Sequence, residues 1–222
     1  MIDESDLALT LGQSIEKTAY TKFLGLVLDE HLTWSTHIDL LCRRISKSIG
    51  VLYRARHLLN LDIMKKLYYN IMYSHISYGT LIWGSNYETK IRPIHILQKR
   101  ALRIISFSDS RAPSRPLFQK FKMLNIFEIV KLQLAEIAYK CVNKQLPFSS
   151  SSYFKDVNLS HEYNTRSKKN KNIFVPRKNL NYGQFGVDYK AARTWNEIPF
   201  EIKNSSSITS FRKKFKHYLI SS

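Results

Sequence analysis

The change of hydrophobic period after residue 33 restricts the fold of this chain more than any other feature of its sequence. Phe23 to Leu28 is a short apolar run closed by an acidic turn, which is the pattern of a strand. From Ser35 onward, apolar residues recur at three- and four-residue steps, which is the pattern of amphipathic helices. The sequence therefore predicts a small strand-rich start followed by a mainly helical body.

The first thirty residues are expected to form a small antiparallel sheet. Residues 7–11 alternate apolar and polar side chains, residues 12–13 form a tight turn, and residues 15–20 supply a partner strand. The run from Phe23 to Leu28 adds a strand, and Gly25 inside it indicates a bulge or a close backbone approach. So short a sheet is not stable alone, so we expect it to pack on the helices or, as we favour, on something outside the chain.

Three helices are predicted between residues 34 and 108, and together they form a bundle. The first begins near Trp34 with Thr33 or Ser35 as its cap, the second begins at a capping Asp62, and the third spans about residues 89–107. The inward positions of the first helix are Ile38, Leu41, Ile45, Ile49, Leu52 and Tyr53.

The remainder of the chain is less regular. Helices are expected over residues 115–123 and 127–144, extended pieces over 173–176 and 182–189, a helical turn at 191–195, and a last amphipathic helix capped by Ser207 or Thr209. The segment from Tyr163 to Asn172 has few apolar side chains to bury and is predicted to be a mobile basic loop. The predicted fold class is α+β, mainly α, with a small N-terminal antiparallel sheet (1–33), a helical bundle (34–108) and a mixed basic C-terminal region (109–222).

Charge indicates the class of partner. The 222 residues include 35 Lys and Arg against 17 Asp and Glu, which gives a net charge of +18 and a pI near 9.9. A hydrophobic content of 44% is too high for a disordered tail. The excess of cations predicts a polyanionic partner, nucleic acid first and an acidic membrane surface second.

Cysteine usage and hydropathy favour an intracellular protein, nuclear or cytoplasmic. Cys42 and Cys141 are far apart and lie in helical contexts, so they form neither a disulfide framework nor a zinc motif. The acidic start lacks the basic and apolar regions of a signal peptide. No uncharged apolar run reaches the roughly 18 residues that span a bilayer, so no membrane is expected among the partners.

No catalytic arrangement is evident in the sequence. Converging carboxylates that hold two metal ions are the core of a polymerase site, but this chain has no pair of consecutive aspartates. The histidines are scattered, and no phosphate loop, dinucleotide fingerprint or nucleophile elbow occurs. We therefore expect binding and positioning, with no catalytic residue, no metal ligand and no cofactor in this chain.

Three basic tracts are candidates for nucleic-acid binding. For the first tract, a solvated helix face is as good an explanation as phosphate contact, and for the second tract it is a slightly better one. For the third tract, a disordered linker or a nuclear-localisation patch is nearly as good an explanation as nucleic-acid binding. The third also contains aromatic residues, which suit single-stranded nucleic acid. The candidate residues are Arg43, Arg44, Lys47, Arg54 and Arg56 in the first tract, Lys99, Arg100 and Arg103 in the second, and Arg166, Lys168, Lys169 and Lys171 in the third.

Several short motifs, in order along the chain, resemble the reverse transcriptases of LINE-type (non-LTR) retrotransposons, in particular the jockey-like branch. The first is Lys22-Phe23-Leu24-Gly25, followed by an apolar run, an aspartate and Leu32-Thr33-Trp34. The others are Ile76 to Gly79 with Ile82 to Gly84, Leu97 to Ile105, Tyr163 to Arg166, and Trp195 to Pro199.

The resemblance implies an RNA-directed DNA polymerase in which Lys22, Phe23, Leu24 and Gly25 belong to the primer grip and the helices after them to the thumb. It implies binding of an RNA or DNA template-primer and a partnership with fingers and palm segments, which this sequence lacks. Mg²⁺ is then expected only for the complete polymerase, and activity of this chain alone is in doubt. The alternative is a non-enzymatic basic helical module that binds RNA, DNA or another protein.

Overall fold

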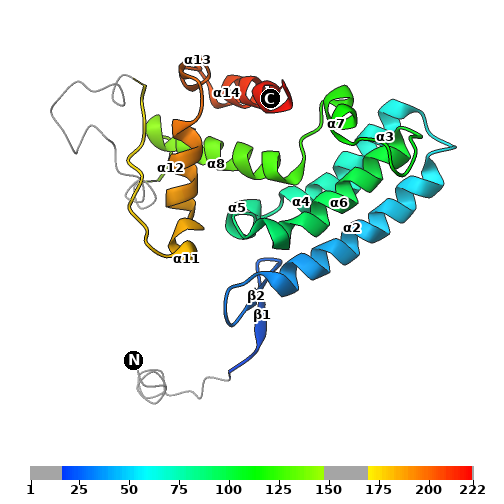
Figure 1. Ribbon diagram of the computed structural model, residues 1–222, viewed down its shortest axis with the longest axis horizontal. Coiled ribbons are helices and arrows are strands. Elements are labelled where there is room, and N and C mark those ends of the chain that lie inside the picture. The colour runs from blue at the N-terminus through cyan, green and yellow to red at the C-terminus, as the bar shows by residue number, and fades with distance from the viewer. Residues whose placement is uncertain (1–16, 148–169, 222) are drawn as a thin grey trace.

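The computed structural model describes residues 17–147 and 170–221. Helices dominate, and one two-stranded antiparallel sheet lies at the N-terminal side, which confirms the predicted α+β, mainly α class (Figure 1). The sequence of elements is β1 (Tyr20–Phe23), β2 (Leu26–Asp29), α2 (Ser35–Ala55), α3 (Leu61–Tyr68), the π-helix η1 (Tyr69–Tyr73), α4 (Ser74–Ser77), α5 (Thr80–Trp83), α6 (Glu88–Ile105), α7 (Arg115–Phe121), α8 (Ile126–Val142), α11 (Asn181–Gln184), α12 (Val187–Asn196), α13 (Phe200–Lys203) and α14 (Ile208–Ser221).

The sheet is a hairpin, so the prediction of one strand from Phe23 to Leu28 was wrong. Phe23 pairs with Leu26, which leaves Leu24 and Gly25 as a two-residue turn. Both turn residues have positive φ, 46° and 81°, as a type I′ turn requires. Gly25 adopts this conformation without steric cost, so the apolar run folds back on itself. The strands expected over residues 7–11 and in the first part of 15–20 lie outside the described residues.

Helix α2 buries the predicted apolar face from Ile38 to Leu52. Ile45 and Leu52 are fully buried, whereas Tyr53, which was expected to face inward, is 55% exposed. The predicted cap was wrong as well: Trp34 is the N-cap residue and makes no side-chain cap. The carboxylate of Asp29 instead accepts hydrogen bonds from the backbone N–H groups of Thr33 and Trp34, at 2.9 and 2.8 Å.

The second predicted helix is interrupted by a π turn. α3 is capped by Asn60 rather than by Asp62, because the Asn60 side chain accepts a hydrogen bond from Ile63 N–H. After Tyr68 the chain passes through η1 before α4 begins. The hydroxyl of the buried Tyr68 accepts a hydrogen bond from Gln98 on α6 at 3.1 Å, which ties this segment to the bundle.

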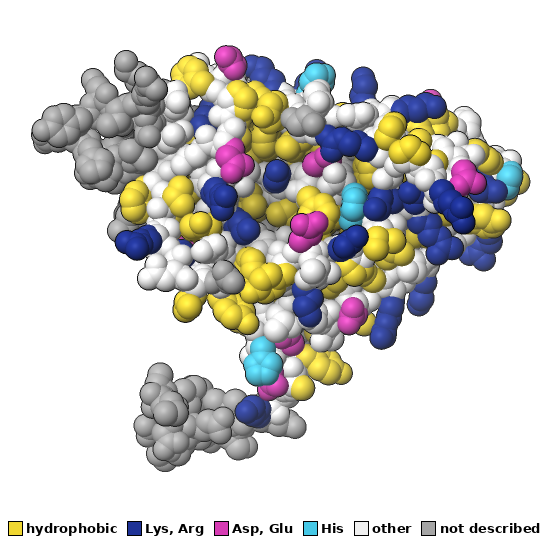
Figure 2. Space-filling view, in the orientation of Figure 1, with side chains coloured by type: hydrophobic (Ala, Val, Ile, Leu, Met, Phe, Trp, Pro, Cys, Tyr) yellow, Lys and Arg dark blue, Asp and Glu magenta, His cyan; other side chains and the backbone are white. Residues whose placement is uncertain are grey.

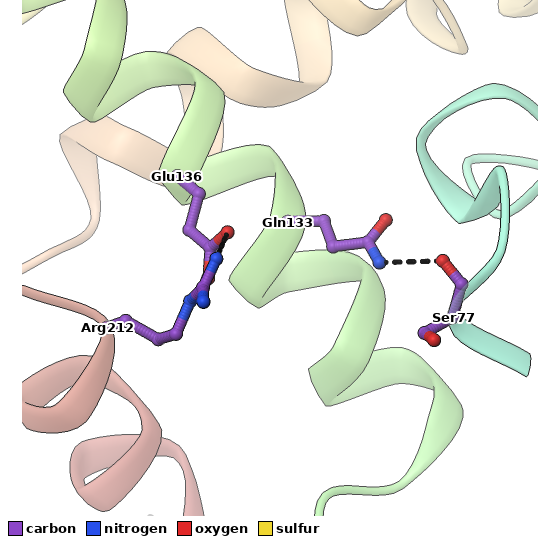
Figure 3. A network of polar contacts seen from close by, with 4 residues as sticks. All are labelled: Ser77, Gln133, Glu136 and Arg212. Atoms are coloured by element: carbon purple, nitrogen blue, oxygen red, sulfur yellow. Dashed lines mark hydrogen bonds and ion pairs between the residues drawn. The ribbon is translucent and has the colours of Figure 1, made fainter. Parts of the chain in front are cut away.

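Helix α8 joins the bundle to the C-terminal elements. Its N-terminus carries a capping box formed by Asn125 and Glu128. Gln133 donates to the carbonyl oxygen of Ser77 at 2.9 Å on one side of α8, and Glu136 binds Arg212 of α14 on another (Figure 3). One continuous buried core therefore extends from α2 to α14. The domain boundaries predicted at 33/34 and 108/109 fall in loops and stay predictions.

The C-terminal region is more helical than its sequence suggested. The segment 182–189, predicted to be extended, belongs to α11 and α12. The physical reason lies downstream: a helix brings Ala191, Ala192 and Trp195 onto one buried face against α8, which an extended chain cannot do. Ser207 caps α14 as predicted, since its hydroxyl accepts from Ser210 N–H at 3.2 Å.

Candidate nucleic-acid interface

A row of exposed residues runs along the outer face of α2, and we call it the α2 stripe. It consists of Arg43, Lys47, Gly50 and Arg54, all of which are exposed. The steps of four, three and four residues place them on one side of the helix over about 16 Å. Basic side chains gather on the molecular surface over α2 (Figure 2). Three of the five residues of the first predicted tract, Arg43, Lys47 and Arg54, thus form a linear cationic surface.

The cations of the stripe have no partner among the described residues. Arg43, Lys47 and Arg54 form no ion pair and no side-chain hydrogen bond with any residue in ranges 17–147 and 170–221. Five ion pairs occur elsewhere in those ranges. The stripe therefore presents full charges that are free to contact phosphates.

Gly50 is in the middle of the stripe, and the fold does not explain why a glycine is there. It lies inside a regular helix, and a Cβ added to it would meet no atom within 4 Å. Glycine in a helix interior costs about 0.5–1 kcal/mol relative to alanine. The bare backbone between Lys47 and Arg54 leaves room for a ligand to approach the helix closely.

A groove of about 490 Å³ lies beside the N-terminal half of α2, between the hairpin and α4. It contains Lys22 and Gly25 from the predicted primer grip and Arg44 from the first basic tract, which the sequence alone had not placed together. No residue lining it is acidic, and its complete lining is Tyr20, Lys22, Gly25, Val27, His37, Leu40, Leu41, Arg44, Ser74, His75 and Tyr78.

Tyr78 holds the hairpin turn against the bundle. Its hydroxyl donates a hydrogen bond to the Leu24 carbonyl oxygen at 2.5 Å. A Cβ at Gly25 would lie 3.4 Å from the Tyr78 ring, so the turn and the ring are in close contact. The four primer-grip candidates Lys22, Phe23, Leu24 and Gly25 are all exposed around this turn. Their position beside the groove fits a contact with a strand end, and their role stays a prediction.

His37 forms the floor of the groove next to Arg44. Its Nδ1 is 3.4 Å from the Val27 backbone nitrogen, whose N–H points to it, so the ring packs against the second strand. Burial lowers the pKa of His37, and the nearby charge of Arg44 lowers it further. The ring is therefore neutral at physiological pH, and Lys22 and Arg44 supply the groove's positive charge.

The second basic tract makes more contacts within the fold than the first. Arg103 donates from Nε to the Ala112 carbonyl oxygen at 2.9 Å and so fixes the loop after α6. Arg100 is exposed, and Lys99 is partly buried beside His95. Burial and then the charges of Lys99 and Arg92 lower the pKa of His95 to about 4. Only Arg100 of this tract resembles the stripe residues in its exposure.

Most of the third basic tract lies outside the described residues, because Arg166, Lys168 and Lys169 precede residue 170. Lys171 is described, and its Nζ donates to the Asn204 side chain at 2.9 Å. Its carbonyl oxygen accepts from the Trp195 indole at 2.7 Å. Lys171 thus helps to hold α12 and α13 together, and its nucleic-acid role stays a prediction.

The described residues contain neither a metal-binding cluster nor a membrane-spanning helix. No three His, Cys, Asp or Glu side chains in 17–147 and 170–221 lie close enough to hold a metal ion. In the same ranges no helix combines the length and apolarity required to cross a bilayer.

Comparison with known proteins finds three related sequences, all from flies. A probable RNA-directed DNA polymerase from transposon X-element of Drosophila melanogaster is 26% identical over 110 residues, 48% of this chain. The RNA-directed DNA polymerase from mobile element jockey of Drosophila funebris is 34% identical over 99 residues, and a probable RNA-directed DNA polymerase from transposon BS of Drosophila melanogaster is 26% identical over 98, each 43% of this chain.

The matched segments are a small part of those proteins. They span 12%, 11% and 11% of the respective relatives, so the chain corresponds to only about a ninth of their length. No family model matches the chain, and no solved structure matches it at comparable significance.

Proposed function

Since the chain is related to the RNA-directed DNA polymerases of jockey-like mobile elements, we propose that it binds the template-primer of such a polymerase. In this proposal the α2 stripe follows the phosphate backbone of the duplex. The hairpin turn and the groove beside it hold the primer end. Because the sequence has no pair of consecutive aspartates, bond formation and its Mg²⁺ would depend on residues outside this chain.

One observation carries the proposal: the stripe cations are unpaired and aligned. Contacts between Arg or Lys and phosphates give affinity without base preference, which is what a polymerase that moves along a duplex requires. Arg44 adjoins Arg43 of the stripe and also lines the groove that contains Lys22, so cationic surface is continuous from the stripe to the hairpin.

The test is a salt titration of binding to an RNA–DNA hybrid duplex, followed by fluorescence anisotropy. Neutralising each phosphate contributes about 0.9 to the slope of log affinity against log salt. Replacing Arg43, Lys47 and Arg54 by Gln is therefore expected to reduce that slope by about 2.7. A matched control replaces three exposed lysines elsewhere, Lys140, Lys213 and Lys214, by Gln.

The control keeps the same net charge as the stripe variant, so a difference between the two reports position rather than charge. Failure to bind the hybrid duplex at low ionic strength would refute the proposal. Equal losses in the two variants, or equal binding of duplex and heparin, would favour the alternative, a basic module without a defined nucleic-acid track.

A further inference from the structure

An exposed cluster of aromatic and cationic side chains lies at the end of α2 away from the hairpin, and we call it the aromatic tip. It consists of Tyr53, Arg56, His57 and Phe107. The Arg56 guanidinium carbon is 4.6 Å from the Tyr53 ring centre and 5.2 Å from that of Phe107. The His57 ring meets the Phe107 ring edge to face at 5.4 Å, and Arg56 Nε donates to His57 Nε2 at 3.0 Å.

Both large rings of the tip are accessible. Tyr53 is 55% exposed and Phe107 is 58% exposed, although the bundle beneath them has a well-packed core. Arg56 orders the two rings without burying them. An exposed and ordered set of aromatic faces is a surface on which a flat ligand can stack.

The backbone at Phe107 fixes where its ring lies at the end of α6. Phe107 follows the C-cap of α6 with φ of 55°, in the left-handed region. The backbone N–H groups of Phe107 and Ser108 bond to Ile104 and Arg103, which is the Schellman pattern in which glycine is the usual residue. Lys122 after α7 and Lys144 after α8 adopt the same conformation, so it fixes the position of the Phe107 ring and does not by itself assign the ring a role.

The tip continues the α2 stripe. Arg54 is the last stripe residue, and Arg56 is the C-cap of the same helix. Two carboxylates lie nearby in the chain, but Asp62 is 3.8 Å from Lys65 and Asp109 accepts from the Arg111 backbone N–H at 2.8 Å. A nucleic-acid strand that follows the stripe therefore reaches a cationic and aromatic surface.

We infer that the aromatic tip is a stacking site for an unpaired nucleobase at the end of the duplex that the stripe holds. This inference rests on the proposed function for its placement of the duplex. Every base has a flat face, so stacking on Phe107 and Tyr53 requires no particular sequence, and the arginines attract the adjoining phosphate. A protein partner would use the same rings without this dependence on phosphate.

The experiment compares two hybrid duplexes that differ only in an unpaired extension of roughly three nucleotides, which contains 2-aminopurine. The extended duplex is expected to bind roughly five- to a hundredfold more tightly than the blunt duplex, with quenching of the 2-aminopurine fluorescence. Phe107→Gly should abolish the preference and the quenching and leave blunt-duplex binding unchanged.

Phe107→Tyr keeps a ring and should retain the preference. Phe200→Gly removes another exposed phenylalanine, far from the tip in the chain, and is the matched control. Should Phe107→Gly not fold, Tyr53→Ala removes the second ring of the site. The inference is overturned if wild type binds both duplexes equally, or if the preference survives in both tip variants.

Failure of the proposed function has a different signature, since the stripe variant then binds blunt duplex as well as wild type does. If no duplex binds at all, the 2-aminopurine oligonucleotide is tested alone. Quenching that depends on Phe107 would still support the tip as a base-stacking site, and its absence would overturn the inference.

Discussion

Helices α2 and α14 have similar sequences in one respect: both are amphipathic, and both carry several Lys and Arg residues. Their cations have different surroundings. Within the described ranges, the stripe residues on the outer face of α2 are exposed and unpaired. On α14, Arg212 makes two hydrogen bonds to Glu136 of α8, at 2.5 and 2.7 Å (Figure 3).

Two other cations near the C-terminus also serve the fold. Lys216 of α14 lies 5.9 Å from the Tyr69 ring centre, and burial lowers its pKa. Lys203 is only 3% exposed and donates to the Asn172 side chain at 2.9 Å. The comparison teaches that the number of cations on a helix does not indicate a binding surface. What matters is whether the neighbouring elements already supply their partners.

Giving the stripe cations an internal carboxylate partner, as Arg212 of α14 has, should weaken duplex binding. In Gly50→Glu the new carboxylate lies three residues after Lys47 and four before Arg54, so it can pair with both. One carboxylate offsets at most one cationic charge, so we expect the salt slope of duplex binding to fall by about 0.9 and the affinity at low salt to fall by about tenfold. Anisotropy titrations measure both quantities.

Gly50→Gln is the neutral control for that variant, since it adds similar bulk without the charge. A loss in Gly50→Gln as large as that in Gly50→Glu would show that space, and not charge pairing, limits binding at this position.

Lys203 should make the stability of the fold depend on pH. Burial lowers its pKa to about 8, from 10.5. Below pH 8 the lysine is charged in both states and its burial opposes folding, whereas above pH 8 the folded state releases the proton first, so stability rises with pH. Relative to Lys203→Met, wild type should gain about 2 kcal/mol in unfolding free energy between pH 7 and pH 9.5.

Urea denaturation at the two pH values measures this change. The Lys47→Met variant is the control, and it should show the same pH dependence as wild type. If the difference in unfolding free energy between wild type and Lys203→Met does not change with pH, Lys203 is not desolvated in the folded state.

Breaking the Arg212–Glu136 pair should affect stability and leave binding intact. The Glu136 side chain is 14% exposed and that of Arg212 is 58% exposed, so screening by solvent limits the contribution of the pair. We expect Arg212→Met to cost about 1 kcal/mol in unfolding free energy, with little change in the salt slope of duplex binding. Lys213→Met, on the exposed side of the same helix, should change neither the stability nor the slope. A reduced slope in Arg212→Met would place α14 in the interface.

The smallest expected effects are those of Gly50→Ala, which should stabilise the fold and weaken duplex binding. Gly50→Ala should raise the unfolding free energy by about 0.5–1 kcal/mol, because alanine is the better helix former and nothing crowds its Cβ. It should also weaken duplex binding a few-fold, because the methyl group keeps the strand from the helix backbone. Val51→Leu adds one carbon at the neighbouring exposed position and should leave affinity unchanged. Equal affinity of Gly50→Ala and wild type would remove the reason we give for the glycine.

The periodic segments were predictable from the sequence, and the irregular ones were not. The helices that became α2, α6, α8 and α14 follow from apolar residues at helical spacing, since burying such a stripe requires a helix whatever packs against it. The hairpin at Leu24 and Gly25 was missed because an apolar run does not show where the backbone turns. The helices between residues 181 and 196 were missed because contacts with α8 decide their conformation.

The sequence by itself determined that this protein is mainly helical and strongly basic, and its motifs indicated a relationship to jockey-like polymerases that the comparisons confirm over part of its length. Only the tertiary structure decided which cations are free. A cation is taken up by the fold when a distant carboxylate or amide, such as Glu136 or Asn172, is brought to it, and the sequence near that cation does not contain this information. Arg54 was left exposed because no other element packs over the outer face of α2.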